Sequence, residues 1–117
     1  MIIISILGCE EMKVYILGND TVGDYRIPEL IDCLVNKLIR EGYHTFISNG
    51  KTIFENSCIN VIEKIKNEFK FIKIFNKQNF AINDIQNEDI LIFLQDDLVK
   101  QFEKCSFKTI NLNEYLK

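Results

Sequence analysis

The segment with the clearest chemical potential is a polar turn of five residues, Ser48-Asn49-Gly50-Lys51-Thr52. Glu55 follows Thr52 at the spacing of a capping box, which predicts that a helix begins here. Backbone N–H groups and the positive dipole end at the start of a helix favour an anion such as phosphate. Gly50 would let a ligand approach the backbone, and the neighbouring side chains would add an ammonium group and hydroxyls. The turn is therefore a candidate phosphate-binding site, with a plain capped strand-to-helix turn as the alternative.

Two carboxylates near the same predicted edge could act on a ligand. Glu55 is a candidate catalytic residue, and Asp96 follows a predicted strand at a position from which it could contact a ribose or a cation. Each has a structural alternative, because Glu55 completes a capping box and Asp96 could be the N-cap of a short helix. The separation between two such carboxylates decides whether they can cleave a glycosidic bond, so this role depends on the fold.

Further candidates follow the first predicted strand. Gly18, Asn19 and Asp20 end that strand, and they form either a ligand-facing loop or a plain exit loop. Arg26 stands before the first predicted helix and could hold a phosphate through two parallel hydrogen bonds, or simply be solvated. The glycine spacings of a Walker A loop and of the dinucleotide fingerprint are absent from the sequence. A nucleotide would therefore be bound by a turn of another kind.

Metal and cofactor chemistry has little support in the residue types. The chain has one histidine, His44, and its four cysteines contain no Cys-x-x-Cys pair. This argues against a zinc site and against a Ser-His-Asp or Cys-His nucleophile. We expect reduced and mostly structural cysteines, with Cys33 and Cys58 on the apolar sides of helices, and therefore a cytoplasmic protein. No metal and no cofactor are expected.

The spacing of apolar residues predicts strands and helices in alternation. Strands are expected at 12–17, 44–47, 71–75, 89–94 and 109–113. The fourth is an almost continuous apolar run, which is typical of a buried parallel strand. Three helices are expected: one with Pro28 in its first turn and ending at Gly42, one beginning at Thr52, and a short one after Asp96-Asp97.

This order predicts an α/β fold, namely a single three-layer Rossmann-like domain with a mostly parallel five-stranded sheet and helices on both faces. Residues 12–117 would form the domain, and residues 1–11 would be an extra strand or a segment outside the core. Ligands of such sheets bind beyond the carboxyl ends of the strands, where the candidate segments would converge.

Composition limits the partners. The apolar run at 1–7 is too short to span a bilayer, so we expect no membrane partner. The net charge of −3 argues against nucleic acid, because phosphate neutralisation needs an excess of lysine and arginine. We expect a homodimer, since doubly wound domains of this size often pair through a helix face or an edge strand.

The same segments resemble the Lonely-Guy and DNA-processing-protein superfamily, known as SLOG. The resemblance lies in the strand MKVYILG, a helix ending REGY, the strand HTFIS and the turn SNGKTIFE. Ser48, Gly50 and Glu55 match the Ser-Gly-Gly-Ala-x-Gly-x-Asp/Glu turn of that superfamily. Asn49, Lys51 and Phe54 depart from it, and the Pro-Gly-Gly signature of the Lonely-Guy phosphoribohydrolases is absent. The opening MKVYILGNDTVGDYR is also similar to nucleoside deoxyribosyltransferase-like proteins, which share this fold.

The resemblance implies a site for a nucleotide, a nucleoside or a molecule derived from one. Some members cleave or transfer N-glycosidic bonds, and others only bind a ligand. Three functions therefore stay open. The chain could bind such a ligand with its phosphate at the turn after the second strand, act on an N-glycosidic bond through Glu55 or the 96–97 pair, or serve as a protein-interaction subunit.

Overall fold

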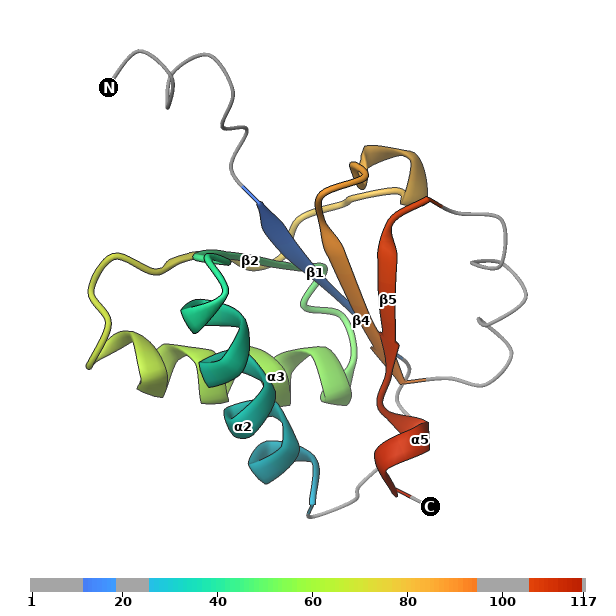
Figure 1. The fold of residues 1–117 in the computed structure, drawn as a ribbon. Helices are drawn as coiled ribbons and strands as arrows, with labels where there is room; N and C mark the ends of the chain where they lie inside the picture. The colour runs from blue at the N-terminus through green and yellow to red at the C-terminus, as the bar shows by residue number, and fades with distance from the viewer. Residues whose placement is uncertain (1–11, 19–25, 95–105, 117) are drawn as a thin grey trace, which may run out of the picture.

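The structure is a computed structural model that describes residues 12–18, 26–94 and 106–116. Its strands are β1 (Lys13–Gly18), β2 (Thr45–Ser48), β3 (Lys73–Phe75), β4 (Ile90–Leu94) and β5 (Lys108–Asn111). Its helices are α2 (Ile27–Arg40), α3 (Ile53–Lys66), the short 3-10 helix η1 (Ile82–Asp84) and α5 (Asn113–Leu116). Figure 1 shows how these elements follow one another through the fold.

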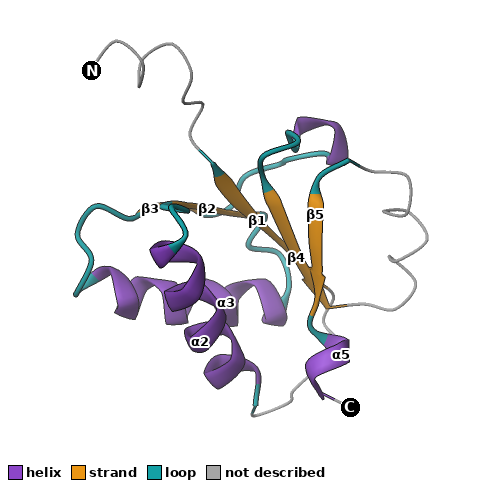
Figure 2. Ribbon diagram, in the orientation of Figure 1, coloured by secondary structure: helices purple, strands orange, loops and turns teal. Residues whose placement is uncertain are grey.

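The five strands form one parallel sheet in the order β3-β2-β1-β4-β5 (Figure 2). The predicted Rossmann-like α/β domain with a five-stranded, mostly parallel sheet is therefore confirmed. The direction of winding reverses between β1 and β4, where Gly18 and Leu94 are register partners. In open parallel sheets, such a reversal opens a crevice at the carboxyl ends of the strands, and ligands bind there.

A buried carboxylate joins the amino-terminal ends of β1 and β4, at the edge of the sheet away from Gly18 and Leu94. Asp89 is 2% exposed and accepts hydrogen bonds from the backbone N–H of Lys13, at 2.9 Å, and of Gln86, at 2.9 Å. The bond to Lys13 spans 76 positions of the chain. It ties the beginning of β1 to the entry of β4.

Helix α2 follows the predicted pattern. Pro28 lies in its first turn, where a missing N–H costs no helix hydrogen bond. The backbone N–H of Tyr43 donates to the Leu38 carbonyl and that of Gly42 to the Ile39 carbonyl. Gly42 has a φ of +106°, so the helix ends in a Schellman motif that needs a glycine at this point.

The two long helices lie on the same face of the sheet (Figure 1). Their buried side chains pack against Val14, Ile16, Phe46, Ile90 and Ile92 of the strands. On the other face, the alternate strand side chains pack with η1 and the segment around it in a smaller cluster: Tyr15, Leu17, Ile47, Ile82, Ile85, Leu91, Phe93 and Phe107 with Phe80. The helix predicted after Asp96-Asp97, which would cover this second face, lies outside the described residues, as does the segment 1–11.

Some boundaries differ from the predicted ones. Strand β3 begins at Lys73 rather than at Phe71, because Ile72 closes a turn by donating its N–H to the Phe69 carbonyl. Helix α5 was not predicted, since four residues give too little periodicity to detect. Cys58 is buried as predicted, whereas Cys33 is exposed on the surface of α2 and is not part of the buried core.

Candidate functional site

The predicted turn 48–52 joins β2 to α3, and its backbone donors are bound by the chain itself. Thr52 is the N-cap of α3, and its Oγ1 accepts the N–H of Glu55 at 3.1 Å. In return, Oε1 of Glu55 accepts the N–H of Thr52 at 3.3 Å and that of Lys51 at 3.0 Å. The N–H of Gly50 donates to Oγ of the buried Ser48 at 3.0 Å. The predicted capping box is therefore confirmed. Together with the bonds of Gly50 and Lys51, it occupies backbone N–H groups that a phosphate would otherwise contact.

Glu55 reaches beyond its own helix. Its side chain is 1% exposed, and its Oε2 accepts the backbone N–H of Gly18, the last residue of β1, at 3.2 Å. The carboxylate thus accepts three backbone N–H groups from two segments. It is the negative charge that the N-terminus of α3 favours. The catalytic role predicted for Glu55 stays a prediction, and to perform it the carboxylate would have to give up these bonds.

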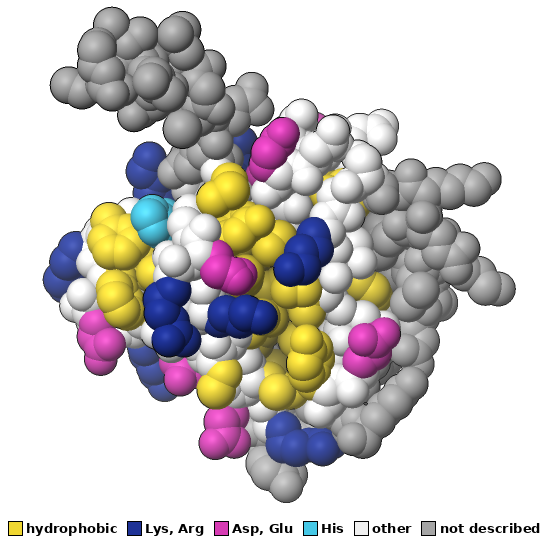
Figure 3. Space-filling model, viewed as in Figure 1, with side chains coloured by type: hydrophobic (Ala, Val, Ile, Leu, Met, Phe, Trp, Pro, Cys, Tyr) yellow, Lys and Arg dark blue, Asp and Glu magenta, His cyan; other side chains and the backbone are white. Residues whose placement is uncertain are grey.

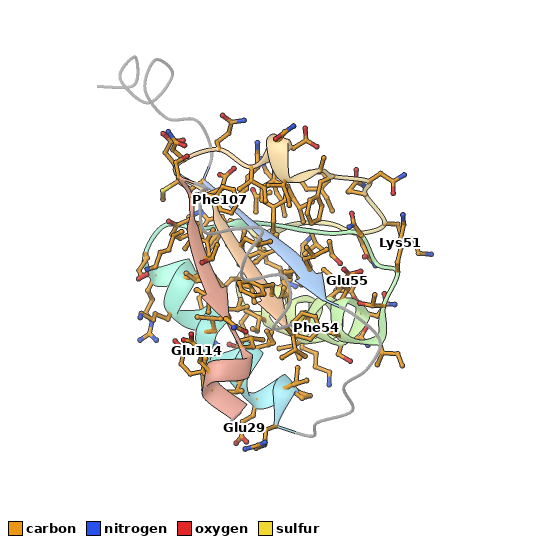
Figure 4. All side chains as sticks on the ribbon, turned by 90° about the vertical axis from the view of Figure 1, so that its right-hand side faces the viewer. Glu29, Lys51, Phe54, Glu55, Phe107 and Glu114 are labelled. Carbon is orange, nitrogen blue, oxygen red and sulfur yellow. The ribbon has the colours of Figure 1, made fainter. Side chains whose placement is uncertain are left out.

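Lys51 is the one residue of the turn 48–52 whose side chain is exposed. Figure 4 shows it pointing away from the sheet while Glu55 lies beside the end of β1. Its ammonium group is a positive charge at the N-terminal end of a helix, at the carboxyl edge of the sheet.

Two glycines in this region are required by packing and backbone conformation. Phe54 lies against Gly18, and a methyl group on Gly18 would collide with the phenyl ring. Gly50 has a φ of +67°, a backbone conformation that residues other than glycine rarely adopt, and the space beside it is filled by the Asn76 side chain. The room that the sequence predicted for a ligand beside Gly50 is therefore occupied by the chain.

The turn after β3 crosses the turn after β2 and is bonded to it. The N–H of Gln78 donates to the Ser48 carbonyl at 3.0 Å, and the N–H of Phe80 donates to Oδ1 of Asn49 at 3.2 Å. Asn49 is thus a bridge between two turns. We call the combined surface of segments 48–52 and 76–80 the carboxyl rim.

A cavity of about 270 Å³ lies directly beside the carboxyl rim, on the face of the sheet opposite α2 and α3. It is lined by Tyr15, Ile47, Phe75, Gln78, Asn79, Phe80 and Asp84. The rings of Tyr15 and Phe80 meet edge to face at 4.9 Å, and the Tyr15 hydroxyl donates to the Asp84 carbonyl at 3.4 Å. Burial raises the pKa of Tyr15, and the charges of Asp89 and Asp84 raise it further, so the phenol stays neutral.

Sequence reasoning did not find this cavity. Its wall comes from the segment 76–88, whose polar composition is typical of a loop. Its floor comes from apolar strand residues, whose pattern predicts a place in the core. The only signal is the apolar spacing of Phe80, Ile82 and Ile85 within the polar segment. These side chains anchor the segment to the sheet.

The structure brings some predicted site residues together and separates another. Gly18, Glu55 and the turn 48–52 meet at one place. Arg26 lies at the start of α2, in a different hollow that it lines with Glu29, Leu30, Cys33 and Tyr115. Asn19, Asp20 and Asp96 lie outside the described residues.

An apolar groove of about 210 Å³ continues from that hollow, between α2 and α5. It is lined by Leu30, Cys33, Leu34, Lys37, Leu112 and Tyr115. Figure 3 shows hydrophobic side chains gathered over this side of the molecule. Among the described residues that line it, Lys37 alone is charged, so this part of the groove offers few groups that would orient a small polar ligand.

Comparisons with protein-family models, with curated proteins and with solved structures found no match. Among the described residues, no group of three histidine, cysteine or acidic side chains is placed to hold a metal ion. In the same part of the chain, no helix has both the length and the apolar character needed to cross a membrane.

Proposed function

We propose that this chain binds a nucleotide- or nucleoside-derived small molecule at the carboxyl rim of its sheet. The observation that carries the proposal is the hydrogen bond between Glu55 and Gly18. It holds the N-terminus of α3 at the end of β1, which is the strand where the winding of the sheet reverses. This is the place where open parallel sheets bind ligands.

The phosphate of such a ligand would lie beside Lys51, at the N-terminal end of α3. This differs from a cradle of backbone N–H groups, because Glu55 and Ser48 already accept those of Lys51, Thr52 and Gly50. The exposed ammonium group of Lys51 then supplies the charge, and Lys77, also exposed, lies on the same rim.

A thermal-shift panel tests the proposal. The probes are nucleoside mono- and triphosphates, cyclic nucleotides, NAD, ADP-ribose and inorganic phosphate. A specific probe at about a hundred times its Kd should stabilise the fold by roughly 2.7 kcal/mol, a shift of roughly 10 °C for a domain of this size. Lys51→Ala should abolish the shift, whereas Lys66→Ala, which removes the same charge at the other end of α3, should retain it.

A panel without any shift would count against the proposal, and so would equal losses in the two lysine variants. Release of free base in the same mixtures would instead favour an N-glycosidic hydrolase or transferase. In that case Glu55→Gln should stop the release if Glu55 is the catalytic carboxylate.

The second candidate function is that of a subunit that associates with a copy of itself in the cytoplasm. The apolar groove between α2 and α5 favours it, because Tyr115 is 59% exposed at its edge. Sedimentation should give a dimer that Tyr115→Glu dissociates. Phe71→Glu, at a ring that is 50% exposed on another side, is the matched control and should leave it intact. A monomer at all concentrations would contradict this candidate.

A further inference from the structure

The floor of the cavity beside the carboxyl rim is a single row of side chains across three strands. Tyr15 of β1 is the register partner of Ile47 of β2, and Ile47 is the register partner of Phe75 of β3. Register partners on parallel strands point to the same side of a sheet, so the three side chains form one continuous apolar row on this face. Such a row offers an apolar contact surface to one face of a ring.

This row becomes more exposed toward the edge of the sheet. Tyr15 is 4% exposed, Ile47 is half-buried, and Phe75, on the edge strand, is 46% exposed. Much of the Phe75 side chain is therefore not covered by the described residues. Aromatic rings in that position stack with other rings and gain free energy beyond that of area burial alone.

The wall of the cavity carries polar groups that can donate and accept hydrogen bonds. The side-chain amide of Asn79 makes no hydrogen bond to another described residue. Nε2 of Gln78 donates to the Asn76 carbonyl at 3.1 Å, which leaves the side-chain oxygen of Gln78 as an acceptor. Oδ2 of Asp84 accepts the N–H of Ala81 at 2.8 Å, which fixes the carboxylate and leaves its other oxygen. An apolar floor with amides and a carboxylate at its side suits a heteroaromatic ring with polar edges.

The size of the cavity sets a limit on what enters it. About 270 Å³ is slightly less than the roughly 300–1,000 Å³ of pockets that enclose a drug-sized molecule. A ring system fits within it, and the rest of a nucleotide would stay outside. The wall is bonded to the turn 48–52 through Gln78 and Phe80, so the remaining part of the ligand would lie toward Lys51.

We infer that this cavity binds the purine or pyrimidine base of the ligand, with the ring against Phe75 and its polar edge toward Asn79, Gln78 and Asp84. The inference rests on the proposed function for the nature of the ligand. To that proposal it adds the place where the protein recognises the base, namely the face of the sheet opposite α2 and α3.

The chain contains no tryptophan, so one introduced tryptophan reports without background. Phe75→Trp places the reporter at the cavity, and Phe71→Trp places it on a ring that is similarly exposed but packs against His44 instead. Titration with adenosine, guanosine, cytidine and uridine should quench the emission of Phe75→Trp to saturation with at least one nucleoside. The emission of Phe71→Trp should not change.

Affinity measurements on untagged protein complete the test. In calorimetric titrations with the nucleoside monophosphate that binds best, Phe75→Ala should weaken binding at least tenfold, and Asn79→Ala should change the preference among bases. Both side chains are exposed, so both variants should fold, which circular dichroism checks. Phe71→Ala should bind as the original chain does.

The outcomes separate this inference from the proposed function. Ribose 5-phosphate and inorganic phosphate carry no base, so they test the rim alone. Nucleotide binding that is lost in Lys51→Ala but unchanged in Phe75→Ala and Asn79→Ala would overturn the base cavity and leave the rim proposal standing. Equal quenching of both tryptophan variants would also overturn it, as a nonspecific effect. Absence of binding by every probe would overturn both.

Discussion

The carboxylate of Glu55 accepts the backbone N–H of Gly18 at 3.2 Å and so joins the first turn of α3 to the last residue of β1, 37 positions earlier in the chain. The same side chain closes the capping box through its other oxygen. One buried carboxylate therefore fixes both the start of a helix and its position against the centre of the sheet.

Glu55→Gln should lower the free energy of unfolding by about 1–3 kcal/mol. Glutamine has one carbonyl oxygen, so its NH₂ group would face the N–H of either Gly18 or Lys51, and one buried donor would lose its acceptor. Urea denaturation measures the change. The matched control is Glu63→Gln, an exposed position of the same helix, which should stay within about 0.5 kcal/mol of the original chain. Equal effects at both positions would contradict the capping role.

Gly18→Ala should destabilise the fold by about 1–3 kcal/mol, because the added methyl group collides with the buried ring of Phe54. Phe54→Leu alone should also destabilise it, since a fully buried aromatic side chain is reduced in size. The double variant should nevertheless be more stable than Gly18→Ala alone, as the smaller side chain makes room for the methyl group. Thermal melts of the four proteins check this, and simple additivity would refute the close contact.

Lys77 has a φ of +59° in the turn that crosses segment 48–52, although it carries a side chain. Lys77→Gly should therefore be more stable than Lys77→Ala by about 1 kcal/mol, because alanine keeps the strain of the left-handed region. At Lys64, exposed within α3, the order should be reversed by a similar amount. Chemical denaturation of the four variants measures both differences, and the same order at the two positions would be inconsistent with the turn.

Burial raises the pKa of the Cys58 thiol, and the charge of Glu55 raises it further. The unfolded chain ionises this thiol near a pKa of about 8.5, whereas the folded chain keeps it protonated. The stability from this group is complete below that pH and decreases above it, by up to about 1.4 kcal/mol per pH unit. Cys58→Ala should therefore make the loss of stability between about pH 8 and 10 less steep. Cys33→Ala, at an exposed thiol, should leave that slope unchanged.

The elements that carry strong periodicity or cap signals could be predicted from the sequence. The stripe of α2, the terminal Gly42 and the Thr52–Glu55 capping box are local, so their signals lie within a few residues. The alternation of strands and helices then limits the topology of the sheet. Strand β3 was less well placed, because an edge strand of three residues is defined by its pairing with β2 rather than by its own pattern.

The candidate site was only partly predictable for the same reason. The position of the turn 48–52 follows from local signals, but the state of its N–H groups depends on where the Glu55 side chain goes. The cavity depends on contacts between Tyr15 and Phe80, which are 65 positions apart, and no local pattern encodes them. Long-range contacts of this kind decide which polar groups remain available to a ligand.

The pairing of β1 with β4 has a consequence for synthesis of the protein. Strand β4 lies more than seventy positions after β1 in the sequence, and the hydrogen bond between Lys13 and Asp89 spans the helices and strands that come between them. As the chain leaves the ribosome, β1, β2 and β3 emerge first, with one side of β1 still lacking its neighbour. The middle of the sheet can therefore close only after residues 90–94 have emerged, and a chaperone that shields the growing chain would act on that open edge of β1.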